Sequence, residues 1–286
     1  GNTGIEFNRS KDCAGDCFGE AYIDDCEVCA GGNTGNISNE DKDDCGVCFG
    51  DNSTCGGCTD PYAVNYDENN LIEDGSCTFY EGPIWYVDVN GSEYPNGTQE
   101  QPYSTIQEAV DAAYLGDTII VGPGQYNFAD EPIRVDNKNL LIKSSDGSDS
   151  TILNIEQFDY TYGNYYEHKL FYIGSSIVEI QGFTITESDY VDFCSEQNQF
   201  KIFYSSSSQV SLKDIKVKNF DVYFCNSEYT NFQVIYSNQD NFNIENMTIE
   251  DNSFEYVDRQ QHSLLIKSMQ SIFVTKNLSI KNNIFK

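Results

Sequence analysis

The chain has 286 residues and a formal net charge of −30, from 46 acidic against 16 basic residues. This charge argues against nucleic acid and anionic membrane surfaces as partners, and it leaves divalent cations and neutral or cationic surfaces. The sequence contains no apolar run of 18 residues, so we expect no membrane span. It shows neither an initiator methionine nor a signal peptide, and we expect a mature or partial chain.

Nine of the 11 cysteines lie before residue 80, in acidic segments with little apolar periodicity. Such segments cannot bury enough apolar surface to fold unaided, so we expect disulfides, an oxidising compartment and a secreted protein. N-linked glycans are expected at the Asn-x-Ser/Thr sequons of a secreted chain. The sequons are at Asn8, Asn36, Asn52, Asn90, Asn96, Asn246 and Asn277.

Residues 1–57 consist of cysteine-rich acidic repeats. Asp12-Cys13 recurs 32 residues later as Asp44-Cys45, and the opening Gly-Asn-Thr-Gly recurs at 32–35, so we expect the chain to begin inside a repeat. We expect disulfides from Cys13, Cys17, Cys26, Cys29, Cys45, Cys48 and Cys55. One cysteine of this odd set needs a partner from an upstream unit or another molecule. The Cys-x-x-Cys pairs also fit zinc knuckles, which the acidic, sequon-bearing context disfavours.

Residues 58–82 form a small module and a linker. The stretch G-C-T-D-P-Y-A-V-N-Y-D…D-G-S-C resembles short modules that recur in tandem in secreted microbial proteins, and the preceding D-C-x-G-x-C-x-G units resemble cysteine-rich repeats of cell-surface and matrix proteins. The resemblance implies a disulfide between Cys58 and Cys77. The first 82 residues hold 18 acidic and 3 basic residues. Carboxylate and amide oxygens suit calcium, with Asp60, Asn65, Asp67 and Asp74 as candidate ligands; the alternative is a solvated acidic surface.

Residues 83–128 change character. We predict a strand over 84–89, a helix over 105–113 and a buried strand over 118–121. Ile106, Ala109, Val110 and Ala113 share one helical face, and Ser104 or Thr105 is placed to cap it. The run W-Y-V-D-V-N-G…S-T-I-Q-E-A-V-D-A-A-Y-L-G-D-T-I-I-V-G-P-G-Q-Y closely resembles the entry to pectin-lyase-like right-handed parallel β-helix domains. The resemblance implies a β-helix over 83–286 whose N-terminal end is covered by a cap at 84–114.

The last third of the chain repeats one hydrophobic pattern four times. The copies begin at Val178, Val210, Phe242 and Ile272, and each alternates apolar with polar residues across two short strands. Phe171, Ile202, Val234 and Ile266 supply a third apolar position at spacings of 31, 32 and 32. Three strands per repeat of about 31 residues, without intervening helices, predict a mainly β solenoid.

Several side chains of the coils are candidates for a role of their own. Cys194 and Cys225 lie one coil apart and are expected to form a disulfide. A loop over 158–168 carries Tyr160, Tyr162, Tyr165 and Tyr166, which either stack on sugar rings or pack within the protein. His168 and His262 are expected in loops as solvated residues. Asn246 and Asn277 share a corner position, where an inward hydrogen-bonded asparagine ladder would exclude a glycan.

The outward columns do not collect carboxylates. They read Thr184, Lys216, Thr248, Ser279 and Thr186, Lys218, Glu250, Lys281, while Glu179 and Glu245 lie two coils apart. We therefore predict no enzyme and no organic cofactor, but an extracellular glycosylated structural protein of a surface, matrix or filament. The alternatives are a carbohydrate-binding or adhesion protein, and a polysaccharide lyase, hydrolase or epimerase of the β-helix type. No capping segment follows the last strand pair, which favours further coils or head-to-tail self-association.

Overall fold

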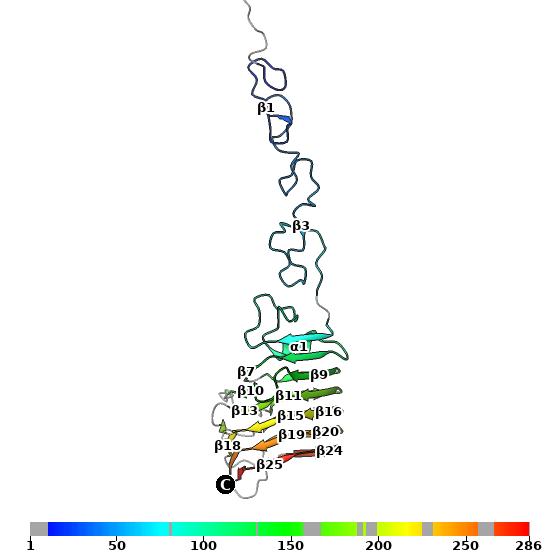
Figure 1. The fold of residues 1–286 in the computed structure, drawn as a ribbon, viewed down its shortest axis with the longest axis vertical. Helices are drawn as coiled ribbons and strands as arrows, with labels where there is room; N and C mark the ends of the chain where they lie inside the picture. The colour runs from blue at the N-terminus through cyan, green and yellow to red at the C-terminus, as the bar shows by residue number, and fades with distance from the viewer. Residues whose placement is uncertain are drawn as a thin grey trace, which may run out of the picture. The chain divides into compact units, whose positions relative to one another are not determined.

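The computed structural model describes residues 11–79, 82–129, 131–156, 167–187, 191–192, 199–224, 231–256 and 266–285. The chain divides into two compact units, residues 1–79 and 80–286, close to the boundary predicted at 82/83. Unit 2 is a stack of parallel strands, and unit 1 consists mostly of loops (Figure 1). No helix of the described residues is long and apolar enough to cross a bilayer.

Unit 2 is a parallel β-solenoid, as predicted, built from four sheets. Sheet 1 contains β8 (Ile133–Asp136), β11 (Glu167–Gly174), β15 (Gln199–Ser206), β19 (Asn231–Asn238) and β23 (Ile266–Met269). Sheet 2 contains β5 (Ile84–Val87), β6 (Thr118–Val121), β9 (Asn139–Ser144), β12 (Ile177–Gln181), β16 (Gln209–Lys213), β20 (Asn241–Glu245) and β24 (Ile272–Lys276). Sheet 3 contains β7 (Gly124–Phe128), β10 (Thr151–Ile155), β13 (Thr184–Glu187), β17 (Lys216–Lys218), β21 (Thr248–Glu250) and β25 (Ser279–Lys281). Sheet 4 contains β14 (Val191–Asp192), β18 (Asp221–Phe224), β22 (Ser253–Tyr256) and β26 (Ile284–Phe285).

Two register predictions were wrong by one residue. Phe171 pairs with Phe203, Ile235 and then Ile266, rather than with Ile202 and Val234. Both residues of each pair, such as Ile202 and Phe203, are buried, so alternation alone could not choose between them. In the fourth copy, Phe273 stacks below Phe242 at 5.1 Å between ring centroids and faces inward. Ile272 and Val274 therefore point outward and are 66% and 59% exposed.

The N-terminal cap is α1 (Ile106–Ala112), which ends with the N–H of Ala113 bonded to the carbonyl of Ala109. Thr105, one of the two caps expected from the sequence, is the N-cap, and it forms a capping box with Glu108. The ammonium of Lys138, just before β9, donates to the carbonyls of Val110 and Ala113 at 2.5 and 3.0 Å. The side-chain oxygen of Gln107 accepts the N–H of Arg134 on the edge strand β8 at 2.7 Å. The helix therefore supplies partners to the edge that the first coil leaves open.

Side-chain ladders at the corners fix the height of successive coils. The N–H of Ser176 donates to Ser208 Oγ at 3.1 Å, the N–H of Ser208 to Asp240 Oδ1 at 2.7 Å, and the N–H of Asp240 to Ser271 Oγ at 3.1 Å. At another corner, buried Asn252 accepts the N–H of Phe220 at 3.0 Å. These bonds satisfy backbone donors that a strand cannot reach at a corner.

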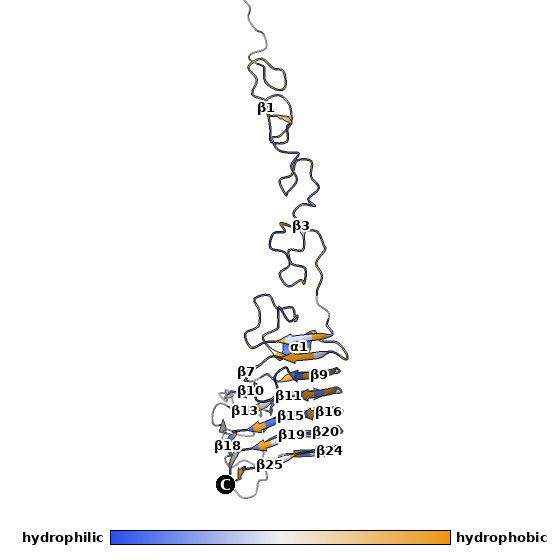
Figure 2. Ribbon diagram, in the orientation of Figure 1, coloured by the Kyte–Doolittle hydropathy of each residue, from blue (hydrophilic) through white to orange (hydrophobic). Residues whose placement is uncertain are grey.

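Unit 1 contains two small sheets. An antiparallel pair joins β1 (Tyr22–Ile23) and β2 (Cys29–Ala30), and a parallel pair joins β3 (Gly56–Gly57) and β4 (Ile72–Glu73). Figure 2 shows hydrophobic residues on the strands of unit 2, with mostly hydrophilic residues along the loops of unit 1. Four disulfides crosslink this unit, which has little apolar core of its own.

We predict that Asn252→Ala will destabilise the β-helix. Asn252 is 1% exposed, and its removal leaves the buried N–H of Phe220 and the carbonyl of Val217 without this partner. We expect the free energy of unfolding to fall by about 1–3 kcal/mol, measured by urea denaturation. Asn243→Ala, an exposed position on sheet 2, is the matched control and should change stability much less. Equal effects would contradict the role assigned to the buried ladder.

Candidate functional site

The outward residues of the coils form columns, because strand register places each one beside its equivalent in the next coil. The column predicted from Thr184 is observed in register, although Thr184 itself is buried, and Lys218, Glu250 and Lys281 of the second column are paired as predicted. Glu179 and Glu245 also lie on the outward face of sheet 2. Glu179 bonds Lys213 of the next coil at 2.8 Å, and Glu245 bonds Lys276 of the coil after it at 2.5 Å.

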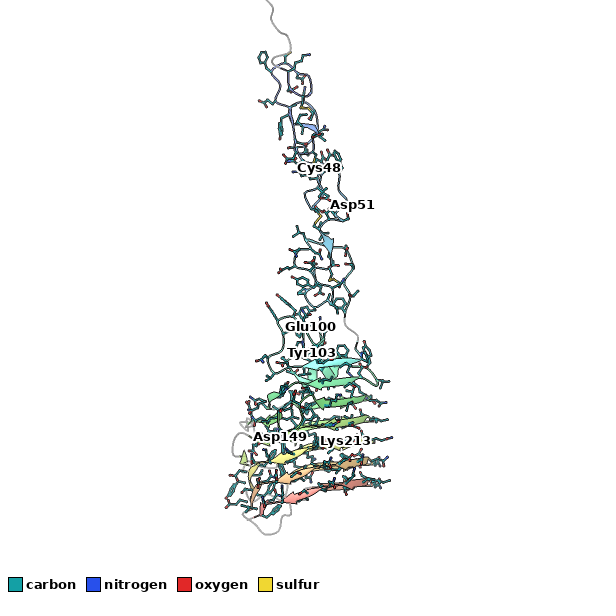
Figure 3. The ribbon with its side chains drawn as sticks, in the orientation of Figure 1. Cys48, Asp51, Glu100, Tyr103, Asp149 and Lys213 are labelled. Atoms are coloured by element: carbon teal, nitrogen blue, oxygen red, sulfur yellow. A yellow bond between two sulfur atoms is a disulfide. The ribbon has the colours of Figure 1, made fainter. Side chains whose placement is uncertain are left out.

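The same arrangement recurs on sheet 3. Glu250 bonds Lys281 at 2.8 Å, and Asp149 bonds Lys216. Figure 3 labels Lys213 on β16 and Asp149 just before β10. The ammonium of Lys276 lowers the pKa of Glu245, and that of Lys216 lowers the pKa of Asp149. These carboxylates hold lysines of other coils instead of converging on a common point.

Sheet 1 carries a column that the sequence reading missed. The rings of Tyr172, Tyr204 and Tyr236 stack in register, with centroids 5.4 and 5.2 Å apart. The guanidinium of Arg134 lies 4.2 Å from the Tyr172 centroid, and the ammonium of Lys201 lies 4.3 Å from that of Tyr236. Tyrosines spaced by 32 residues were the available signal. Cation–π contacts of this kind stabilise neighbouring coils and gather positive charge in an acidic protein.

Burial changes the titration of this column. Lys201 is 4% exposed, and loss of solvation, with a smaller contribution from nearby Lys267, lowers its pKa to about 8. Burial likewise lowers the pKa of Lys169. It raises the pKa of the Tyr204 hydroxyl. Burial therefore removes water from the charged lysines of this column, and the cation–π contacts with the tyrosine rings compensate for only part of the lost hydration.

Three loops of unit 1 share one construction. Each begins with an aspartate, Asp12, Asp24 or Asp43, whose backbone N–H bonds the carbonyl four residues on. One carboxylate oxygen accepts N–H groups within the loop, and the other accepts an N–H beyond it, from Ala21, Asn39 or Asn52 respectively. These backbone bonds lower the pKa of Asp12 and Asp24.

The disulfides link these loops in series. Cys13 of the first loop bonds Cys29 of the second, and Cys26 of the second bonds Cys48 of the third. Cys45 continues to Cys55, and the implied Cys58–Cys77 disulfide is present. All four sulfurs of the two Cys-x-x-Cys pairs are thus engaged in disulfides. Sequence spacing alone could not give this connectivity.

Cys17 is the cysteine of the odd set that has no disulfide partner among the described residues, and it is an exposed thiol; its bond to an upstream unit or another molecule stays a prediction. The backbone of Cys17 forms an antiparallel β-bridge with Lys11. Cys48 forms the same bridge with Lys42, and Cys29 is paired in the same way with Ile23 in the β1–β2 sheet. It therefore occupies, in the first loop, the position that a preceding loop crosslinks in the other two. Cys194 and Cys225 lie outside the described residues, and their disulfide stays a prediction.

The calcium candidates are not gathered into one site. Asp60, Asp67 and Asp74 accept the N–H groups of Tyr62, Asn69 and Ser76 in local turns at 2.9 Å each. Asn65 bonds the backbone of Ser76 and Thr78. Among the described residues, the one group of three donor side chains with metal-ligand spacing is Cys58, Glu73 and Cys77, whose two sulfurs form a disulfide. Calcium binding stays a prediction.

The sequons differ in accessibility. Asn96 is 8% exposed and its amide donates to Gln101, so the folded chain leaves little room for a glycan there. Asn36, Asn90, Asn246 and Asn277 are exposed, Asn52 is half-buried, and Asn8 lies outside the described residues. The corner ladder exists, because Asn277 donates to Asn246 at 2.8 Å and Asn246 to Asp214 at 3.0 Å. The inward position considered for this ladder was wrong, because both asparagines are exposed.

The histidine and tyrosine predictions fall mostly outside the described residues. His262 and the four tyrosines Tyr160, Tyr162, Tyr165 and Tyr166 lie there. His168 was expected in a loop, but it is in β11 and pairs in register with Phe200. The strand begins earlier than its apolar residues suggested.

Comparison with known proteins gives little functional guidance. No protein-family model matches the chain, and no solved structure matches it. The uncharacterized protein YwoF of Bacillus subtilis strain 168 is 35% identical over 65 residues, which are 23% of this chain and 13% of YwoF. The chain thus spans a small part of that protein. The resemblance to pectin-lyase-like domains stays an expectation beside the β-solenoid that the structure shows.

We predict that Lys201 makes stability rise with pH. Between about pH 8 and the ordinary lysine pKa of 10.5, the unfolded chain keeps the proton and the folded chain releases it, so raising the pH favours folding. Below about pH 8 both states are charged, and the folded state bears the full burial penalty. The urea midpoint should rise from pH 7 to pH 9.5, and Lys201→Met should flatten this rise. Lys213→Met on sheet 2 is the matched control; an unchanged slope in Lys201→Met would contradict the prediction.

Proposed function

We propose that this chain is an extracellular structural protein, a component of a surface, matrix or filament that assembles through its cysteine-rich loops and the end of its β-helix. The observation that carries the proposal is the serial disulfide pattern of unit 1, in which each loop is bonded to the next. Disulfides of this density are typical of oxidising, extracellular environments. Cys17 is available to a further loop of the same kind, in this polypeptide or in another molecule.

The β-helix supports the same proposal. Its outward carboxylates bind lysines of other coils, which strengthens the stack. The last described coil exposes Ile280, Ile284 and Phe285, each about half accessible. Its strands also have a neighbour on one side only. Further β-structure, from the same polypeptide or a second molecule, would pair these edges and bury these side chains.

A second candidate function is binding of an anionic saccharide along sheet 1. The observation in its favour is the gathering of Arg134, Lys169, Lys201 and Lys267 beside the stacked tyrosines, in a chain of net charge −30. Burial of Lys201 and the ion pair between Arg134 and Asp136 reduce the charge available to a ligand. We therefore rank this function below structural assembly.

The test is secretion of the chain from an oxidising host, followed by non-reducing electrophoresis and negative-stain electron microscopy. We expect disulfide-linked dimers, the largest species that one free thiol per chain can give, and their loss in Cys17→Ser. Phe18→Ser, at the adjacent exposed position, is the control and should retain them.

Monomers of 32.2 kDa with a free Cys17 thiol and no ordered assemblies would contradict the proposal. Release of unsaturated uronides from pectin or alginate would favour a polysaccharide lyase instead. Binding of a uronate polymer without cleavage would favour the sheet 1 ligand.

A further inference from the structure

The outward face of sheet 2 carries three exposed aliphatic side chains in two neighbouring columns. Ile177, in the middle of the sheet, is 49% exposed, and Ile272 and Val274 on β24 are exposed to a greater extent. The correction of the register in the last coil places Ile272 in one column with Ile177, and Val274 in the next column. A sheet face of a secreted acidic protein would ordinarily carry charged side chains at such positions.

Two neighbouring columns on this face enclose a furrow of about 530 Å³. The first column consists of Asn139, Ile177, Gln209, Asn241 and Ile272, and the second of Leu141, Glu179, Ser211, Asn243 and Val274. The furrow crosses the strands, over the buried side chains of Val178, Val210 and Phe242. Its walls are amide, hydroxyl and aliphatic groups, with Glu179 as the one charged residue of the two columns.

The face is also nearly neutral. Glu179 and Glu245 are each paired with a lysine, and Lys143 adds one positive charge, so three lysines face two glutamates and the local charge is +1. The whole chain carries −30. Two copies of so acidic a protein repel one another through their net charge, and a nearly neutral face adds little to that repulsion. Sheet 1, by contrast, gathers the cations Arg134, Lys169, Lys201 and Lys267 beside its tyrosine column.

We propose that the outward face of sheet 2 is a self-association surface through which two copies of this chain pack side by side. The columns of both copies have the same spacing. In a two-fold arrangement, the first column of each copy, which contains Ile177, therefore enters the furrow of the other copy. Amide side chains such as Gln209 and Asn241 then bond one another across the contact, as in interdigitated β-sheets. This lateral contact is separate from the disulfide and end contacts of the proposed function.

The size of the face sets the expected strength. Sheet 2 has seven strands about 4.8 Å apart, so the face is about 29 Å long across the strands. Five residues with a rise of about 3.3 Å each make it about 16 Å wide along the strands, which gives an area on the order of 500 Å² per copy. Specific stable interfaces bury about 800 Å² per partner, so this contact lies at the weak end of that range. The structure therefore assigns a reversible dimer that forms at micromolar concentrations, and not an obligate one.

The experiment is sedimentation equilibrium of the full chain in a Cys17→Ser background, so that disulfide-linked species cannot contribute. We expect a reversible species of twice the 32.2 kDa chain mass. The isosteric double variant Gln209→Glu, Asn241→Asp places like charges on the face and should weaken dimerisation at least about ten-fold. Gln125→Glu, Asn127→Asp makes the same changes at exposed positions of β7 on sheet 3 and should leave it unchanged. Circular dichroism and the urea midpoint establish that both variants are folded.

A chain that stays monomeric over the whole micromolar range overturns the proposal, as does equal dimerisation of the two double variants. An insoluble neutral glucan serves as the probe for the other occupant of the furrow. If the monomer binds this glucan, and the sheet 2 variant alone loses the binding, the face is a saccharide site and the self-association proposal is wrong. Because the disulfide is absent throughout, none of these outcomes bears on the role of Cys17.

Discussion

Register between coils is the constraint on which the β-helix depends. In the later coils, parallel backbone hydrogen bonds place a residue beside the one 31 or 32 positions further on, which stacks Phe171 on Phe203 with ring centroids 5.2 Å apart. Side chains alternate between inside and outside, so a slip of one residue would turn the core toward solvent. The corner ladders through Ser208 and Asn252 oppose such a slip, because they bond the backbone of one coil to a side chain of the next.

The outward faces owe their different chemistry to the same register. Sheet 3 and one edge of sheet 2 carry ion pairs between coils, and sheet 1 carries the tyrosine column with its cations. The middle of sheet 2 is left neutral and partly aliphatic. Because the register repeats, equivalent outward residues of successive coils form a continuous strip along the β-helix. Extended surfaces of this kind fit the structural function proposed above.

Much of this architecture follows from the sequence, because repetition of apolar residues at 31 or 32 positions has few structural solutions. The cap was also predictable, since Thr105, Glu108 and the apolar face of the helix obey general capping and burial rules. The exact register was not predictable where adjacent residues are all apolar. In the run 272–274 either alternation gives an apolar face, and only the pairing of Phe273 with Phe242 decides it.

The candidate sites were less accessible to sequence reasoning. The order of disulfides in unit 1 depends on which loops meet in space, and the spacing of cysteines does not contain that information. The tyrosine column was visible as a 32-residue period, but the cations above the rings come from other positions in the coil. The aliphatic strip on sheet 2 could not be found before the last coil was placed in register.

Engineered disulfides test the register most directly. Asn243 and Val274 are paired outward neighbours in adjacent coils, about 4.8 Å apart and within the reach of a disulfide. The pair Asn243→Cys, Val274→Cys should therefore form a bond, identified by mass spectrometry of the non-reduced protein. The diagonal pair Asn241→Cys, Val274→Cys is separated by about 8 Å and should stay reduced. A bond in the diagonal pair, or none in the first, would contradict the register on which this account rests.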